Sequence, residues 1–133
     1  MFVDTSAFGA MAVLRDHDHD RAIAIQRRLT EEGRRLVTTN FVLAETHALL
    51  LGKVGRILAL RILQEIERGK TAILRVSVAE ERAARRILAQ YADKDFSLVD
   101  ATSFAVMDRL GLLLAFTFDR HFAQYGLTLV APE

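Results

Sequence analysis

The chain contains no cysteine and only one proline among its 133 residues. Without thiols it has neither a disulfide framework nor a thiolate metal centre. None of its apolar runs is long enough to span a bilayer. The amino terminus also lacks the basic and long apolar stretches of a secretory signal. These absences predict a cytoplasmic protein that is not inserted in a membrane.

An excess of charge of one sign is also missing, since the formal net charge is only +1. The composition, with 51% hydrophobic and 26% charged residues, is neither that of a disordered chain nor that of a strongly basic nucleic-acid binder. The length predicts a single domain over residues 1–133, large enough to bury one core.

Short apolar segments alternate with amphipathic helical patterns along the whole chain. Strands are predicted at residues 1–4, 35–38, 72–76, 112–117 and 127–130. Helices are predicted to end near residues 14, 32, 51, 68, 91 and 109. Such alternation is typical of an α/β domain with a mainly parallel sheet of about five strands and right-handed crossovers.

Details of the helices follow from local signals. Asn40 is a good N-cap for a helix over residues 41–51, and Gly52 and Gly55 predict a break after it. The helix that ends at Arg109 begins with a capping box of Ser97 and Asp100. Its core-facing side is predicted to carry four residues: Leu98, Ala101, Ala105 and Leu110.

Acidic residues occur where such a sheet would gather them. Asp4 ends the first predicted strand, Asp119 follows the fourth, and Asp100 opens a helix. In open α/β sheets the ligand cleft lies beyond the carboxyl ends of the strands, so these three carboxylates are expected to converge there. Glu45 lies in the first turns of another helix and joins them if that helix leans over the edge. Each acid also has a purely structural interpretation, as a helix cap, a turn residue or a solvated helix residue.

Converging carboxylates favour a bound cation. Two like charges about 4 Å apart repel by roughly 4 kcal/mol at an effective dielectric near 20, and a divalent ion offsets this. Oxygen ligands suit Mg²⁺ or Mn²⁺. Because no Ser-His or Cys-His nucleophile set is evident, phosphodiester hydrolysis is the chemistry that fits best. The hydroxyls of Thr5, Ser6 and Thr117 flank the acids and either orient a carboxylate or a metal-bound water, or only cap helices.

Four short segments, in this order and at these spacings, match one known family: residues 2–6 (FVDTS), 38–46 (TTNFVLAET), 95–105 (DFSLVDATSFA) and 115–122 (AFTFDRHF). Over almost its whole length the chain resembles the PIN-domain ribonucleases of the VapC toxin type. The resemblance implies a three-layer α/β/α fold and a Mg²⁺- or Mn²⁺-dependent endoribonuclease. It implies metal ligation around Asp4 and Asp100, with Glu45 and Asp119 completing an acidic catalytic pocket.

The resemblance also implies partners. Proteins of this type act on RNA, are often the toxic half of a toxin–antitoxin pair, commonly form homodimers and are blocked by a small antitoxin protein. Arg15, Lys94 and Arg120 lie near the acids in sequence and are candidates for contact with RNA phosphates. The segment 57–66 is apolar around more than one helical face, which predicts contact with a twin subunit or an antitoxin helix, or else full burial within the monomer.

Two further features allow a functional or a plain interpretation. The tract at residues 16–20 (DHDHD) alternates metal-ligand types, but a solvated loop is the favoured interpretation. For His121, packing over the fourth strand is favoured over contact with substrate. Among rival functions, a non-catalytic PIN-like interaction module stays open. An aspartate-nucleophile phosphatase is disfavoured because Ser6 stands where the second Asp after Asp4 is needed.

Overall fold

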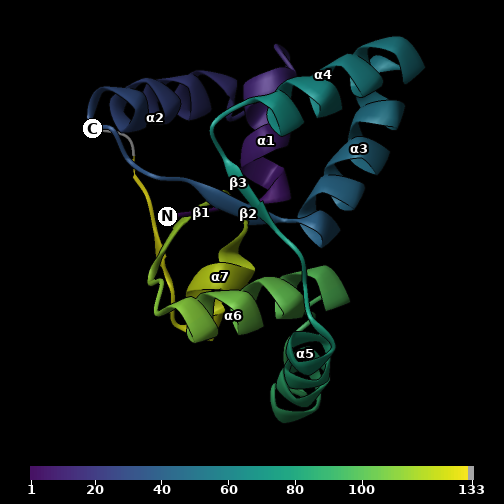
Figure 1. The fold of residues 1–133 in the computed structure, drawn as a ribbon, viewed down its shortest axis with the longest axis vertical. Coiled ribbons are helices and arrows are strands. Elements are labelled where there is room, and N and C mark those ends of the chain that lie inside the picture. The colour runs from purple at the N-terminus through teal and green to yellow at the C-terminus, as the bar shows by residue number, and fades with distance from the viewer. Residues whose placement is uncertain (132–133) are drawn as a thin grey trace.

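The computed structural model describes residues 1–131 and contains one five-stranded sheet in which every strand pair is parallel (Figure 1). The strand order is β3-β2-β1-β4-β5. The strands are β1 (Phe2–Val3), β2 (Val37–Thr39), β3 (Ala72–Leu74), β4 (Leu114–Phe116) and β5 (Thr128–Leu129). This confirms the predicted α/β class and the parallel five-stranded sheet, although each strand is shorter than predicted.

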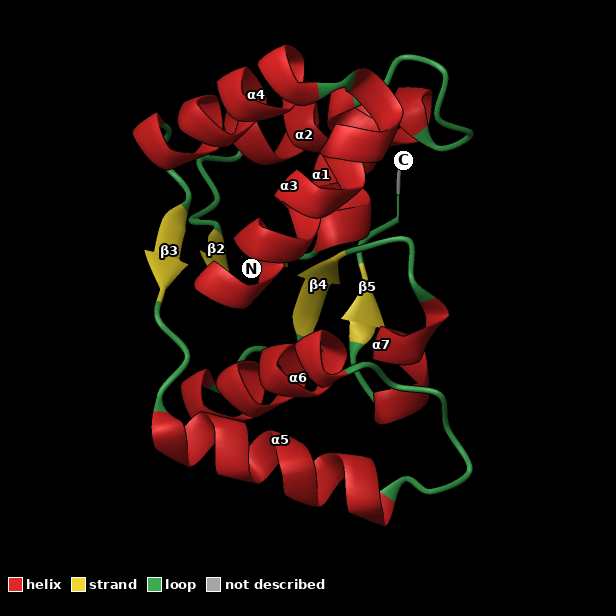
Figure 2. Cartoon of the chain, turned by 90° about the vertical axis from the view of Figure 1, so that its right-hand side faces the viewer, coloured by secondary structure: helices red, strands yellow, loops and turns green. Residues whose placement is uncertain are grey.

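Helices cover both faces of the sheet, with α1 to α4 on one side and α5 to α7 on the other (Figures 1 and 2). They are α1 (Thr5–Ala12), α2 (His19–Glu31), α3 (Asn40–Val54), α4 (Arg56–Arg68), α5 (Val78–Gln90), α6 (Leu98–Leu110) and α7 (Arg120–Tyr125). The three-layer α/β/α arrangement is therefore confirmed. Within residues 1–131, no helix has the length and apolar character needed to cross a bilayer.

Aromatic side chains make up much of the contact between the sheet and the second helical layer. Phe2 of β1, Phe104 of α6 and Phe122 of α7 are fully buried. The rings of Phe104 and Phe122 meet edge to face at 5.0 Å, and Phe122 lies 6.3 Å from Phe2. Burying one such ring contributes about 1.5–3 kcal/mol. This packing fixes where α6 and α7 begin relative to the sheet.

An ion pair between buried Glu80 and largely exposed Arg109 joins α5 to α6. Glu80 is 4% exposed and accepts a hydrogen bond from Nε of Arg109 at 2.7 Å. Burial alone would raise the pKa of Glu80, but hydrogen bonds from Arg109 and Ser77 and the charge of Arg109 together hold this pKa below its ordinary value. The pair keeps α6, which carries Asp100, aligned on its neighbour.

The cap of α3 differs from the prediction. Thr39 is the N-cap, and its hydroxyl accepts a hydrogen bond from the backbone N–H of Val42 at 3.1 Å. The side chain of Asn40 instead accepts from the backbone N–H of Val76 at 2.9 Å, just beyond β3. Both residues are competent caps, and this long-range hydrogen bond decides between them.

Glycine and leucine positions in the helices were also partly mispredicted. α3 continues through Gly52, and the break comes at Gly55, which has a φ of 85°. Leu98 and Leu110, predicted to face the core, are 40% and 39% exposed because they are the first and last residues of α6. For residues 57–66, the alternative of full burial within the monomer is wrong, since Ala59 is the only buried residue of α4. The preferred prediction, contact with a partner chain, stays a prediction.

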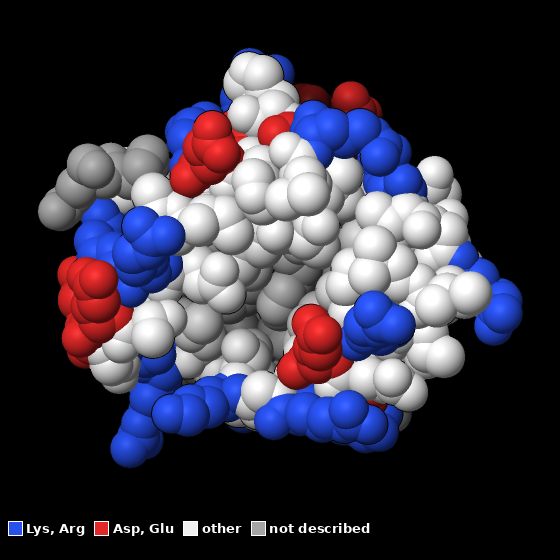
Figure 3. Space-filling view, turned by 90° about the horizontal axis from the view of Figure 1, so that it is seen from above, with Lys and Arg blue, Asp and Glu red and all other residues white. Residues whose placement is uncertain are grey.

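The structure has a groove of about 960 Å³ between α1, α2 and α4. Phe8, Met11, Leu29 and Ile62 are among its apolar lining residues, and its basic ones are Arg34, Arg35 and Lys70. The space-filling view from this side shows the hollow with blue basic side chains along part of its rim (Figure 3). Because residues 36–37 and 71–72 line it, the groove opens at the amino ends of β2 and β3.

Two glycines of the helices should respond to alanine in opposite directions. Gly111 ends α6 with a φ of 67°, so we expect Gly111→Ala to lower the free energy of unfolding by about 1 kcal/mol. Gly52 lies inside α3 with open space around it, and Gly52→Ala should raise that free energy by up to about 1 kcal/mol. Urea denaturation measures both. Changes of the same sign would contradict the assigned ends of these helices.

Candidate active site

The acidic residues lie at the point of the sheet where the strand order reverses. From β1 the chain proceeds through β2 to β3 on one side, whereas β4 and β5 lie on the other side of β1. Asp4 follows β1 directly, and Thr117 follows β4 directly, with Asp119 two residues further on. The carboxyl ends of adjacent parallel strands at such a switch point form the ligand-binding crevice of open α/β sheets.

Asp4 is held by side chains from two segments. It is the N-cap of α1 and is only 3% exposed. Its Oδ2 accepts hydrogen bonds from the hydroxyls of Thr117 at 2.9 Å and Ser6 at 3.0 Å. The two hydroxyl oxygens also lie 3.0 Å apart. Because each hydroxyl has one proton, donating to Asp4 uses the donor capacity of both.

The same hydroxyls also accept backbone hydrogen bonds. Ser6 Oγ accepts from the N–H of Phe118 at 2.9 Å, and Thr117 Oγ1 accepts from the N–H of Asp119 at 3.0 Å. The turn after β1 is thereby joined to the turn after β4. The hydroxyls of Ser6 and Thr117 therefore orient the carboxylate of Asp4 and do not serve only as helix caps. The hydroxyl of Thr5 does not orient this carboxylate, because it donates to the carbonyl oxygen of Val42 at 3.4 Å.

The environment of Asp4 disfavours its ionised form. Burial raises its pKa from 3.8 to about 6, and the negative charge of Asp100 acts in the same direction. Hydrogen bonds from Thr117, the Thr5 backbone and Ser6 oppose this rise without cancelling it. A buried carboxyl with so raised a pKa is typical of a functional site.

Asp100 combines a capping role with convergence on the site. It is the N3 residue of α6, where its Oδ2 accepts from the backbone N–H of Ser97 at 3.0 Å and completes the predicted capping box. The same oxygen lies 2.9 Å from Nδ1 of His121. The side chain is 8% exposed. Asp100 therefore does cap α6, as its structural interpretation expects. The same carboxylate also faces His121, so the cap does not exclude a functional role.

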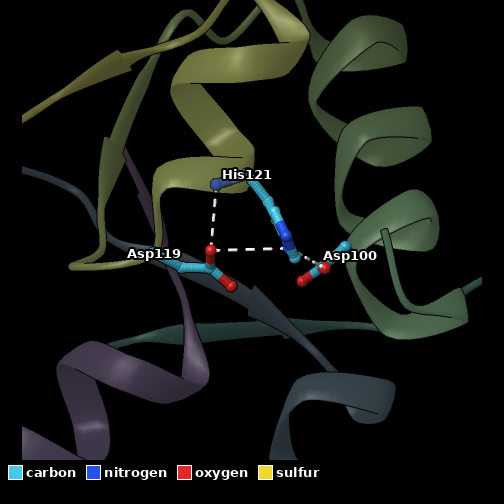
Figure 4. A group of neighbouring side chains, drawn as sticks. All are labelled: Asp100, Asp119 and His121. Atoms are coloured by element: carbon cyan, nitrogen blue, oxygen red, sulfur yellow. Dashed lines mark hydrogen bonds and ion pairs between the residues drawn. The ribbon is translucent and has the colours of Figure 1, made fainter. Parts of the chain in front are cut away.

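Asp119 and His121 come from the first turn of α7, a six-residue helix that the sequence patterns did not predict. Asp119 caps this helix, and its Oδ1 accepts from the backbone N–H of His121 at 2.9 Å. Nδ1 of His121 lies 3.5 Å from the same oxygen (Figure 4). One ligand atom from each of Asp100, Asp119 and His121 lies within 4.8 Å of the others. The preferred interpretation of His121, packing over the fourth strand, is wrong, because the imidazole faces the two carboxylates.

Glu45 lies at the same edge but outside this three-residue group. It is in the second turn of α3, which begins directly after β2, and it is partly buried. Among residues 1–131 it has no hydrogen bond or ion pair that would fix its carboxylate. Asp4 also lies outside the group, although the charge of Asp100 affects it. The structure thus brings Asp4, Asp100 and Asp119 together at the carboxyl edge of the sheet, where open α/β folds have their ligand crevice, and leaves Glu45 at the side.

The predicted basic contacts fall in different places. Arg15 donates from Nη2 to the carbonyl oxygen of Lys53 at 2.7 Å, near the ends of α1 and α3 that are farthest from the acids. Lys94 pairs with Asp93 at 3.3 Å in the loop before α6. Arg120 is exposed and directly follows Asp119. Arg15 is therefore placed away from the crevice, whereas Arg120 is at its rim.

Arg21 is a basic residue near the site that the sequence patterns did not single out. Its guanidinium carbon lies 5.4 Å from the centre of the Phe118 ring, next to Asp119, and it pairs with Asp18 at 2.9 Å. The contact joins α2 to the turn after β4, so only the folded chain reveals it. The solvated loop predicted for residues 16–20 is confirmed in part: residues 16–18 lie in a turn, where the His17 side chain is 93% exposed. His19 and Asp20 instead begin α2, and Nδ1 of His19 lies 2.7 Å from the carbonyl oxygen of Ala10.

The donor set at the crevice fits a divalent cation. Within residues 1–131, no lysine or arginine forms an ion pair with Asp4, Asp100 or Asp119, and the basic side chain within ion-pair distance of Asp100 and Asp119 is the imidazole of His121. Carboxylate oxygens together with one imidazole nitrogen are ligands for Mg²⁺, Mn²⁺ and related ions. Burial is the main cause of the raised pKa of Asp4, and the charge of Asp100 adds to it. A bound cation of this kind would favour the ionised carboxylate against both effects.

The fold and the crevice agree with comparisons to known proteins. A family model described as the PIN domain matches residues 1–127. The chain belongs to the PIN-domain family. It is 32% identical over 133 residues to the 23S rRNA-specific endonuclease VapC20 of Mycobacterium tuberculosis, covering 100% of this chain and 99% of that protein. It is 30% identical over 124 residues to ribonuclease VapC26 of the same species, covering 92% and 90%.

Solved PIN-domain structures share the architecture. The crystal structure of M. tuberculosis VapC20, described as a sarcin–ricin loop cleaving toxin, superposes with a TM-score of 0.89 and covers 98% of both chains. FitAcB of Neisseria gonorrhoeae has a TM-score of 0.68 at 15% identity, covering 98% of this chain and 96% of that one. FitAB bound to a DNA fragment has a TM-score of 0.69 at 16% identity, covering 98% and 94%. At such low identity the two Fit structures show the fold alone.

The raised pKa of Asp4 predicts a pH-dependent stability of the metal-free PIN domain. Folding favours the protonated form of Asp4, because its pKa is higher in the folded state than in the unfolded one. The contribution of this group to the free energy of unfolding is therefore complete below about pH 4 and is lost as the pH rises through about 6. Asp4→Asn keeps an oxygen acceptor without the charge. At pH 7.5 in EDTA it should be more stable than the wild type by up to about 3 kcal/mol, at 1.36 kcal/mol per pKa unit.

Thermal and urea unfolding from pH 3.5 to 8 test this expectation. The advantage of Asp4→Asn should shrink to nothing at the acid end of the range. Asp95→Asn, which removes an exposed carboxylate of the α5–α6 loop, is the matched control and should show no such trend. An Asp4→Asn variant that is less stable than wild type at pH 7.5 would mean that the charged carboxylate stabilises the fold.

Proposed function

We propose that this protein is a Mg²⁺- or Mn²⁺-dependent endoribonuclease that hydrolyses RNA phosphodiester bonds as the toxin of a toxin–antitoxin pair. The observation that carries the proposal is the convergence of Asp4, Asp100 and Asp119, from three distant segments, at the switch point of the sheet. Full-length similarity to the endonuclease VapC20 supports it. In this proposal residues 1–133 act as one nuclease domain in the cytoplasm.

The proposed roles follow from how each carboxylate is held. Asp100 and Asp119 hold the cation from the N-terminal ends of α6 and α7. Asp4 presents a rigid carboxylate, because Ser6 and Thr117 fix its Oδ2. Glu45 completes the acidic pocket from α3. A bound divalent ion there would lower the pKa of a water molecule and offset charge on the phosphoryl oxygens.

RNA must reach these acids past positive groups that hold its phosphates. Arg21, Lys94 and Arg120 are the proposed contacts, since each is in or beside a segment that borders the crevice. Such contacts position the backbone without reading its sequence. Because VapC20 is described as cleaving the sarcin–ricin loop, we propose this stem-loop of 23S rRNA as the first substrate to test.

Cleavage of RNA should depend on the metal and on Asp100. With Mn²⁺ or Mg²⁺, the wild type should cut a sarcin–ricin stem-loop or another RNA of a total cellular pool, and EDTA should abolish the reaction. Asp100→Asn should reduce the rate by at least about 100-fold, on the scale of losing one group that stabilises transition-state charge. Gel analysis of end-labelled RNA gives the rates.

The control for Asp100→Asn is again Asp95→Asn, which should cleave at the wild-type rate. Circular dichroism confirms that both variants are folded. If the wild type cuts no RNA in the pool and shows no saturable Mn²⁺ binding, the endoribonuclease proposal fails. The protein would then be a non-catalytic interaction module built on the same fold.

Two surfaces support the proposed protein partners. The groove between α1, α2 and α4 has apolar lining and basic residues, which suits an amphipathic helix with acidic side chains from a small antitoxin. The hairpin of α3 and α4 exposes a separate set of large apolar residues: Leu49, Leu51, Ile57, Leu58 and Leu60. We assign this second surface to a homodimer contact, since several large apolar side chains are exposed on this one hairpin and exposed apolar surfaces often mark association sites.

Variants of the two surfaces should have separable effects. Gln26 is an exposed residue lining the groove, and Gln26→Trp should weaken binding of the antitoxin encoded by the adjacent reading frame by at least about 10-fold, or roughly 1.4 kcal/mol. Ile57 is 67% exposed on the hairpin, and Ile57→Glu should shift the protein from dimer to monomer.

Each variant is the control for the other. Calorimetry with the antitoxin should detect a defect only in Gln26→Trp, and sedimentation velocity only in Ile57→Glu. A wild type that is monomeric at tens of micromolar would refute the homodimer assignment. Antitoxin binding that is weakened equally by both changes would mean that one surface, not two, receives the partner.

A further inference from the structure

The imidazole of His121 lies among the acids, yet the four-carboxylate pocket gives it no role. Its Nδ1 lies 2.9 Å from Oδ2 of Asp100 and 3.5 Å from Oδ1 of Asp119. All three side chains point into the same space between α6 and α7 (Figure 4). The group therefore offers one nitrogen together with carboxylate oxygens.

The spacing of these atoms is that of neighbouring ligands on one ion. Two adjacent ligands of an octahedral cation, each 2.0–2.1 Å from the metal, lie about 2.9 Å apart. The nitrogen-to-oxygen distances at His121 are 2.9 Å and 3.5 Å, and the ligand atoms of all three residues lie within 4.8 Å of one another. Side-chain adjustments of about an ångström would therefore seat one cation against all three groups. Ordinary rotamer wells are broad enough for such adjustments.

The ring is also fixed before any ion binds. The backbone N–H of His121 donates to Oδ1 of Asp119 at 2.9 Å, which ties this residue to one of its proposed co-ligands. The imidazole lies edge to face on Phe96 at 5.4 Å, and Phe96 is itself edge to face on Phe104 at 5.0 Å. Preorganised ligands of this kind lose little conformational entropy on binding.

We propose that His121 ligates the cation through Nδ1, together with Asp100 and Asp119, and that this nitrogen makes the site select Mn²⁺ over Mg²⁺. Imidazole suits transition-metal ions, whereas Mg²⁺ prefers oxygen ligands and keeps much of its water. The inference rests on the proposed metal-dependent function and adds to it the identity of the preferred ion.

Titration calorimetry of each metal alone gives the first test. Wild type should bind Mn²⁺ at least about 10-fold more tightly than Mg²⁺. His121→Asn, which places an amide oxygen near the former Nδ1, should lose about 10- to 100-fold in Mn²⁺ affinity and change little for Mg²⁺. His17→Asn removes a fully exposed imidazole from the turn before α2 and should behave as wild type. Unchanged Mn²⁺ affinity in His121→Asn would overturn the proposal.

Pulsed electron paramagnetic resonance of Mn²⁺-loaded wild type gives a second test that needs no substitution at the site. A directly bonded nitrogen should produce a ¹⁴N coupling, and labelling the histidines with ¹⁵N should convert it to the ¹⁵N pattern. Where His121→Asn folds, the coupling should disappear, whereas in His17→Asn it should remain. Saturable Mn²⁺ binding without a nitrogen coupling would overturn the ligand assignment.

The outcomes separate this inference from the proposed function. RNA cleavage and tight Mn²⁺ binding without any bound nitrogen would leave the endoribonuclease intact and remove His121 from the metal. Absence of both metal binding and cleavage would refute the function itself. A bound nitrogen with equal affinity for the two metals would retain the ligand and refute the selectivity.

Discussion

The hydrogen-bonded corner around Asp4 is the constraint on which the rest of the site depends. Two hydroxyls from separate turns donate to one carboxylate oxygen and each accept a backbone N–H, so the ends of β1 and β4 are fixed to each other. Asp119 follows this corner by two residues, and α7 starts from it. The corner also buries a carboxyl group whose ionisation is disfavoured, which places an unfavourable charge where a cation can offset it.

Much of the fold and three of the acids could be predicted from the sequence because they depend on regular patterns. Alternating apolar segments and helices imply a parallel sheet, and parallel strands direct their carboxyl ends to one edge. Asp4, Asp100 and Asp119 each lie beside a strand end or a helix start, so topology alone brings them close. The capping signal at Ser97 was equally reliable, since α6 begins with a full capping box.

What could not be predicted depends on contacts between distant side chains. α7 is only six residues long, too short for a periodic pattern, and without it the direction of His121 is undetermined. Arg21 approaches Phe118 across two layers of the fold. The choice between Thr39 and Asn40 as cap of α3 is made by a hydrogen bond to Val76, a residue 36 positions away. Glu45 is partly buried and has no fixed partner within the described residues 1–131, so neither the sequence nor this part of the fold assigns its carboxylate a single orientation.

The brevity of the strands has a consequence for how the enzyme could be regulated. β2 and β3 have three residues each, which is about 10 Å of extended chain. The groove opens at the amino ends of these strands and the acids lie at the carboxyl edge of the sheet, so the two are separated by little more than the length of these strands. A peptide seated in the groove therefore needs only a short tail to cover the catalytic crevice. One continuous segment of a very small inhibitor can then both bind in the groove and block access to the acids.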